Sequence, residues 1–182
     1  MPDASDPPLP HPDLLAAIPR LRRYARVLTG DANRADDLVQ DTLARAWEKR
    51  RLWAAGSDLR AWLFTIMHNV FINQRGLASR DQMLVSLEDG GEGSEAWQIP
   101  VRATQYTRVE LAELVQHVGR LPTDQREVLL LAAVEELRYE EIAVALSIPI
   151  GTVMSRLSRA RAKLRLVFAD ATTNPSGLKV VK

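Results

Sequence analysis

The sequence predicts an all-α protein with two small helical domains joined by an acidic flexible linker. Three observations carry this prediction. Apolar residues recur at helical spacing in seven stretches of the chain. No stretch of the 182 residues shows the alternation that is typical of a strand. Helical periodicity fades between residues 79 and 106, where glycines and acidic residues take its place. The predicted order is an N-terminal tail (1–12), a first helical domain (13–78), the linker (79–106), a second helical domain (107–169) and a C-terminal tail (170–182).

The first domain is predicted to contain three helices. The first spans residues 14–28, and Pro19 within it indicates a kink or a late start. Gly30 and Asp31 are typical of a C-cap followed by an N-cap, so a second helix is expected over residues 33–51. A break at residues 56–58 precedes a third helix over residues 59–74, which is rich in apolar and aromatic side chains.

The second domain is predicted to contain helices at 108–119, 123–134, 139–146 and 151–168, and the last two have the pattern of a helix-turn-helix. Pro149 is expected to end the first of the two, and Gly151 with Thr152 to open the second. Apolar residues fall where the two helices should meet: Ile142, Leu146, Ile148, Val153 and Leu157.

The charge of the chain is unevenly placed, although the net charge is only +1. Residues 151–182 hold seven basic side chains against one acid, whereas residues 79–101 hold five acids against Arg80 alone. This asymmetry indicates one surface that suits a polyanion. The chain has no cysteine, which excludes disulfides, thiolate zinc sites and cysteine nucleophiles and fits a reducing cytoplasm. With no signal peptide and no membrane span in the pattern, we expect a soluble cytoplasmic protein.

Catalytic patterns are missing from the sequence. His11, His68 and His117 are scattered, and the glycines at 90–93 lie among acidic residues that repel phosphate. We therefore expect no enzyme activity, no metal site and no cofactor.

The last predicted helix has the layout that a helix needs in order to enter the major groove of DNA. An apolar stripe lies on one side, and opposite it lie hydrogen-bond donors that can reach phosphates and base edges. The candidate DNA-binding residues on this helix are Thr152, Ser155, Arg156, Ser158, Arg159 and Lys163.

Longer strings of the chain resemble one family. Residues 121–131 (LPTDQREVLLL), 139–143 (YEEIA) and 150–164 (IGTVMSRLSRARAKL) resemble region four of ECF sigma factors. Residues 34–47 (RADDLVQDTLARAW) are similar to region 2.2 of that family, and residues 59–75 to its regions 2.3 and 2.4. The resemblance covers about 14–75 and 110–168.

The resemblance implies a promoter-recognition subunit that binds core RNA polymerase and promoter DNA, with the helix-turn-helix reading the −35 element. It implies polymerase binding through one short helix, at Asp37, Leu38, Gln40, Asp41 and Arg45. It implies reading and melting of the −10 element by the next helix and the loop at 50–58 before it. The candidate −10 residues are Arg60, His68, Asn69, Asn73 and Arg75. Members of this family are often held inactive by an anti-sigma factor, and we expect one here, as part of a stress response.

Two positions depart from the family pattern. Met154 stands where many relatives carry a basic residue, so one DNA contact is expected to be missing. Ser147 occupies a turn position that is often glycine, which costs little if its φ angle stays negative.

One alternative remains open from the sequence, which is a conventional helix-turn-helix regulator that acts without core polymerase. Such a regulator needs a dimerisation surface or a sensor domain upstream, because dimers read paired half-sites. The first helical domain offers neither clearly.

Overall fold

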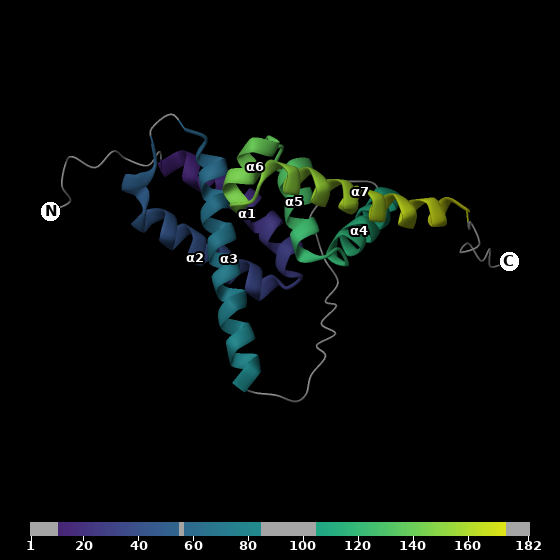
Figure 1. Ribbon diagram of the computed structural model, residues 1–182, viewed down its shortest axis with the longest axis horizontal. Coiled ribbons are helices and arrows are strands. Elements are labelled where there is room, and N and C mark those ends of the chain that lie inside the picture. The colour runs from purple at the N-terminus through teal and green to yellow at the C-terminus, as the bar shows by residue number, and fades with distance from the viewer. Residues whose placement is uncertain (1–10, 55–56, 85–104, 174–182) are drawn as a thin grey trace.

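The computed structural model describes residues 11–54, 57–84 and 105–173, and in these ranges every regular element is a helix. The all-α prediction is confirmed for this part of the chain. In chain order the elements are α1 (His11–Thr29), α2 (Ala32–Glu48), the short 3₁₀ helix η1 (Arg50–Leu52), α3 (Leu59–Leu84), α4 (Gln105–Gly119), α5 (Thr123–Ala133), α6 (Tyr139–Leu146) and α7 (Ile150–Thr173), as Figure 1 shows.

The turn between α1 and α2 has the capping geometry that the sequence predicts. Gly30 takes a φ angle of 76°, and its N–H donates to the Arg26 carbonyl at 3.0 Å. Asp31 caps α2 by accepting from the Arg34 N–H at 2.7 Å. Pro19 lies inside α1, which begins at His11, so the late start expected from this proline is wrong.

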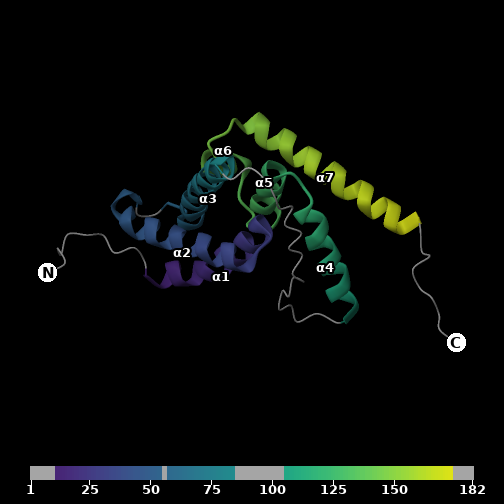
Figure 2. The same ribbon diagram turned by 90° about the horizontal axis from the view of Figure 1, so that it is seen from below.

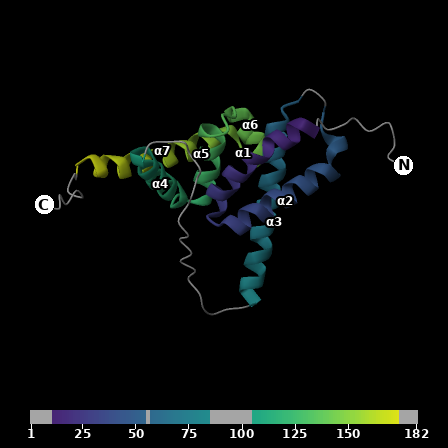
Figure 3. The ribbon, with the colours of Figure 1, turned by 180° about the vertical axis from the view of Figure 1, so that it is seen from behind.

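The third helix is longer than predicted. It continues past residue 74 to Leu84, so the linker expected from residue 79 begins as helix. Figures 1 and 3 show the last turns of α3 projecting beyond the other helices. Helical periodicity fades in the sequence from residue 79, although helix-forming residues can still extend a helix there. The centre of the predicted linker, the first part of the N-terminal tail and the end of the C-terminal tail lie outside the described residues.

The helix-turn-helix is present, with three corrections. α6 matches its predicted bounds and ends at Leu146, so Pro149 does not end it; the C-cap residue Ser147 has a φ of 54°, so the condition of a negative φ, under which serine costs little at this position, is not met. The turn is closed by the Ile148 N–H, which donates to the Ala143 carbonyl at 3.0 Å. α7 begins at Ile150, one residue early, and runs into the tail that was predicted from residue 170.

The two helical domains pack together and share a core. α3 packs against α6, and α1 packs against α4 and α5. Figure 2 shows α5 and α6 beside the first three helices, with α4 and α7 reaching away from them. Buried residues of both domains belong to one hydrophobic cluster, among them Leu21, Leu63, Val128 and Ile142. Within the described residues, no single helix has the length and hydropathy to cross a membrane; α6 and α7 reach that composition only as a pair bent by 104°.

The left-handed conformation of Ser147 leads to a stability prediction. A non-glycine residue in this region costs about 1 kcal/mol because its Cβ crowds the backbone. Ser147→Gly should therefore raise the unfolding free energy by about 1 kcal/mol, measured by urea denaturation followed by circular dichroism. Gly30→Ala is the matched control, because the φ of Gly30 is also positive, at 76°. A Cβ at this position meets nothing within 4 Å, so any loss of stability in Gly30→Ala comes from the backbone conformation and not from a clash. This variant should destabilise the protein. An unchanged midpoint for both variants would contradict the argument.

Candidate nucleic-acid interface

The acidic side of α2 faces solvent. Asp37, Gln40, Asp41 and Arg45 are all exposed, and Gln74 of α3 donates from Nε2 to Asp41 Oδ2 at 2.8 Å. Leu38 is fully buried at 0% exposure, so in this structure it does not lie on the solvent-facing side of α2 with the other predicted polymerase-binding residues. Its side chain instead anchors α2 in the core, because a leucine at 0% exposure has no surface left for a partner.

The predicted DNA-binding residues of α7 lie off its buried stripe. Val153, Leu157 and Ala160 form that stripe, with exposed fractions of 0%, 2% and 0%. Three of the six candidates are exposed, namely Ser158, Arg159 and Lys163, and the other three are half-buried, namely Thr152, Ser155 and Arg156. The exposed residues give α7 a polar face that carries positive charge, as DNA binding needs.

The half-buried candidates on α7 make local contacts. The Ser155 hydroxyl donates to the Thr152 carbonyl at 3.1 Å. Arg156 Nε lies 3.2 Å from Asp124 Oδ2, on the first turn of α5. Among the predicted −35 residues, Arg156 is therefore held by a carboxylate from another helix in the described part of the chain.

The predicted residues of α3 fall into two groups. Asn69, Asn73 and Arg75 are exposed; Asn69 donates to the Thr65 carbonyl at 2.9 Å, and the Arg75 guanidinium lies 5.6 Å from the centre of the Phe71 ring. His68 and Arg60 instead face the second domain. The structure therefore does not bring all five residues onto one open surface.

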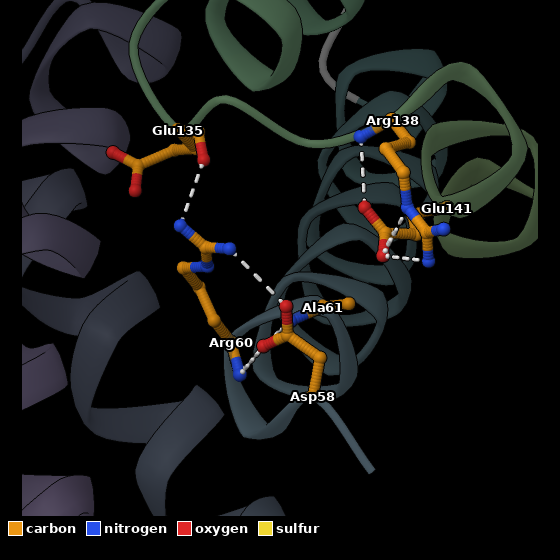
Figure 4. Close-up of polar contacts among 6 residues, drawn as sticks. All are labelled: Asp58, Arg60, Ala61, Glu135, Arg138 and Glu141. Carbon is orange, nitrogen blue, oxygen red and sulfur yellow. Dashed lines mark hydrogen bonds and ion pairs between the residues drawn. The ribbon is translucent and has the colours of Figure 1, made fainter.

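His68 and Arg60 are engaged by α5 and by the loop after it. His68 Nδ1 lies 2.7 Å from Glu127 Oε1, and the His68 side chain is only 15% exposed. Arg60 donates from Nη1 to the Glu135 carbonyl at 3.2 Å and from Nη2 to Asp58 Oδ2 at 3.2 Å, as Figure 4 shows. Each contact joins the two domains or braces a residue that does.

Asp58 and Glu141 fix the starts of two helices beside this contact. The Asp58 carboxylate accepts from the N–H groups of Arg60 and Ala61. Burial alone raises the pKa of Asp58, but the hydrogen bonds from Arg60 and Ala61 outweigh it and lower that pKa. Glu141 accepts from the Arg138 N–H at 2.8 Å and pairs with the Arg138 guanidinium at 2.7 Å (Figure 4).

Arg126 is a residue whose role the sequence analysis missed. Its Nη1 donates to the Leu28 carbonyl at 2.7 Å, and its Nη2 donates to the carbonyls of Leu121 and Gly119. Burial lowers the pKa of Arg126, and the neighbouring charge of Arg75 lowers it further. No local pattern could have found the contact with Leu28, because Leu28 lies in the other domain.

Glu135 is the second residue that was missed, and it is fully buried at 0% exposure. Within the described residues neither carboxylate oxygen has a hydrogen-bond partner, and Arg23 Nη2 lies 3.8 Å from Oε1. Burial raises the pKa of Glu135, against the opposing effect of Arg23, Arg20 and Arg60. An ionised carboxylate with so few partners destabilises the folded state.

The loop expected to form a base pocket lines a hollow of about 520 Å³. Trp53, Ser57 and Asp58 contribute to its wall together with Asp13 and Arg20 of α1. Residues 55 and 56 of this loop lie outside the described residues. Within the part of the chain that is described, no group of three or more His, Cys, Asp or Glu side chains could hold a metal ion.

Comparison with known families explains this combination of surfaces. Residues 14–68 match the family model described as the Sigma2 domain of PhyR, and residues 111–164 match the model described as Sigma-70, region 4. The fold and its α7 surface thus define a helical transcription initiation factor of the sigma-70 class.

Relatives narrow the class. The chain is 40% identical over 159 residues to the ECF RNA polymerase sigma factor EcfG of Rhodopseudomonas palustris, covering 87% of this chain and 84% of the relative. It is 34% identical over 151 residues to the ECF sigma factor SigL of Mycobacterium tuberculosis, covering 82% and 83%. The chain belongs to the ECF RNA polymerase sigma factors.

Solved structures agree with this assignment. The sigma factor RpoE of Bartonella quintana, solved in complex with the anti-sigma factor NepR, is 34% identical with a TM-score of 0.71, over 87% of this chain and 96% of that one. CnrH, solved in complex with the cytosolic domain of CnrY, is 28% identical with a TM-score of 0.60, over 88% and 87%.

The burial of Glu135 leads to a prediction of pH dependence. Because the folded chain keeps this proton to a higher pH than the unfolded chain, stability falls as pH rises from about 4.5 towards the raised pKa, and stays lower above it. Glu135→Gln should remove this loss and raise the unfolding free energy at neutral pH by about 1 kcal/mol, measured by urea denaturation across pH. Arg23→Ala, which removes the nearest compensating charge, should steepen the same loss. An unchanged pH slope in Glu135→Gln would contradict the assignment.

Proposed function

We propose that this ECF sigma factor binds core RNA polymerase through the exposed face of α2 and reads promoter DNA with α3 and α7. The observation that carries the proposal is the pairing of two opposite surfaces in one chain. Asp37, Gln40 and Asp41 present acidic and hydrogen-bonding groups, which suit a basic protein partner and repel DNA. Ser158, Arg159 and Lys163 present donors and positive charge on α7, which suit the major groove of the −35 element.

The −10 element is read by α3 after the two domains separate. Asn69, Asn73 and Arg75 are exposed in the closed chain, but Arg60 and His68 are held by the second domain. DNA that uses these two side chains must displace Glu127 and the Glu135 carbonyl. Promoter binding and closure of the chain therefore compete for the same groups.

An anti-sigma factor is the expected regulatory partner. RpoE, one of the solved relatives named above, was solved with the anti-sigma factor NepR, and CnrH was solved with the cytosolic domain of CnrY. A protein that bridges both domains would favour the closed form, in which Arg60 and His68 are already engaged.

The conventional regulator is the alternative that the sequence left open, and the identity to EcfG over 87% of the chain does not favour it. Transcription with purified bacterial core polymerase separates the two. The proposed function expects initiation at promoters that share two elements, found in a fragment library only when both core and this protein are present. A regulator binds a palindromic site alone and never supports initiation.

Arg159 should contribute to discrimination at the −35 element. Arg159→Ala should lower holoenzyme affinity for the cognate promoter by about tenfold and reduce the preference over a scrambled −35 element. Core binding should be unchanged, since the α2 surface is untouched. The measurement is DNA binding by the holoenzyme on both fragments. An equal loss on the two fragments would assign Arg159 to a phosphate instead of a base.

Linking the two domains should prevent promoter opening. Thr29 and Thr123 line one cleft between the domains, and the chain has no natural cysteine. A Thr29→Cys/Thr123→Cys variant, bridged by a thiol-cleavable bismaleimide, should lose initiation and regain it when the bridge is cleaved. Each single-cysteine variant treated with the same reagent is the control. Full initiation by the bridged protein would show that the domains need not separate.

A further inference from the structure

Arg156 is set apart from its neighbours on α7 by the carboxylate beside it. The Nε–Oδ2 distance to Asp124 is 3.2 Å, and the two side chains are 27% and 45% exposed. The pair therefore lies at the edge of the contact between α5 and α7, between the core and the surface. Arg159 and Lys163, further along the same helix, are exposed.

Both backbones that hold this pair are firmly placed. Asp124 lies in the first turn of α5, where the helix dipole favours a negative charge. Arg156 lies between Val153 and Leu157, whose side chains are buried in the core. Helix packing thus sets the separation of the two groups, so the carboxylate meets the guanidinium without either helix moving.

A carboxylate in this position has two opposing effects on DNA binding. An arginine has five N–H donors in a rigid planar fork, and contact through Nε leaves donors on the Nη atoms. Fixing the guanidinium in one orientation favours a directional contact with a base edge. The same negative charge repels phosphates within a Debye length of about 8 Å at physiological salt. The pair therefore weakens the attraction of Arg156 for phosphates in general and strengthens its directional contact with a base edge.

We propose that Asp124 is a positioning residue for promoter discrimination, which holds Arg156 ready for the −35 element and keeps it from binding phosphates without regard to sequence. Asp124 itself touches no DNA in this arrangement. The inference rests on the proposed function of α7 as the −35 reader.

The experiment uses the full chain assembled with core polymerase. Two promoter fragments share one −10 element, and one carries the cognate −35 element while the other carries a scrambled one. Binding to both is measured across a range of salt concentrations for the wild type and Asp124→Asn. Thermal unfolding of each variant checks that the fold is retained.

Asp124→Asn should reduce the cognate-to-scrambled ratio by about tenfold, mainly because affinity for the scrambled fragment rises. The slope of log affinity against log salt should steepen by about one on that fragment, as the released Arg156 neutralises one more phosphate. A merely structural role predicts the opposite sign, namely weaker binding to both fragments.

Three further variants make the test specific. Glu140→Gln removes the same charge from an exposed position on α6 and should leave the ratio unchanged. Asp124→Glu keeps a carboxylate at this position, so it should retain part of the cognate-to-scrambled ratio that Asp124→Asn loses. In an Arg156→Gln background, Asp124→Asn should change the ratio no further, because the two residues act as one unit.

The outcomes separate this inference from the function on which it rests. An unchanged ratio in Asp124→Asn, or an equal loss of ratio in Glu140→Gln, overturns the positioning role. If Arg159→Ala also leaves the affinity for both fragments unchanged, α7 does not contact the −35 element and the proposed function fails as well. Loss of the ratio in Arg159→Ala alone keeps the proposed function and rejects the inference.

Discussion

The relation between the two halves of this chain depends on one guanidinium, that of Arg126. Its three carbonyl partners lie at the end of α1 and in the turn between α4 and α5. Carbonyls at helix ends have no partner within the helix, and a buried one without a donor costs about 1–3 kcal/mol. The Arg126 side chain on α5 donates to carbonyls at the end of α1 and at the end of α4. The next residue, Glu127, pairs with His68 on α3, so two consecutive residues join α5 to two helices of the first domain.

In this closed packing, the surfaces of α2, α3 and α7 face different directions. The exposed donors of α7 point away from the contact between the domains, whereas the acidic face of α2 reaches it at Asp37, which lines the same cleft as Thr123 and Arg126. α3 lies between the two halves and packs against α6, so part of its surface faces inward. The buried charge of Glu135 belongs to the same contact, which places an unfavourable carboxylate where the halves meet.

Local patterns predicted the helices well wherever burial or capping marked them. The bounds of α6 matched, and Asp31 and Gly30 capped their helices as expected. The last turns of α3 were missed because helical periodicity fades in the sequence from residue 79, and the positive φ of Ser147 was missed although its position is often glycine in relatives. The exposed residues of α2 and α7 followed from helical spacing. The inward placement of Arg60 and His68 could not be predicted from helical spacing, since their partners lie 75 and 59 residues away in the sequence.

The exposure of α2 in the closed chain has a consequence for the order of assembly. A ligand that needs the open form has its apparent affinity reduced by the fraction of molecules that are open, whereas a ligand that binds either form does not. On the proposed function, polymerase binds the exposed residues of α2 in the closed chain, whereas the −10 element needs Arg60 and His68, which the contact between the domains engages. The closed contact then lowers the apparent affinity of the free protein for the −10 element and leaves its affinity for polymerase unchanged.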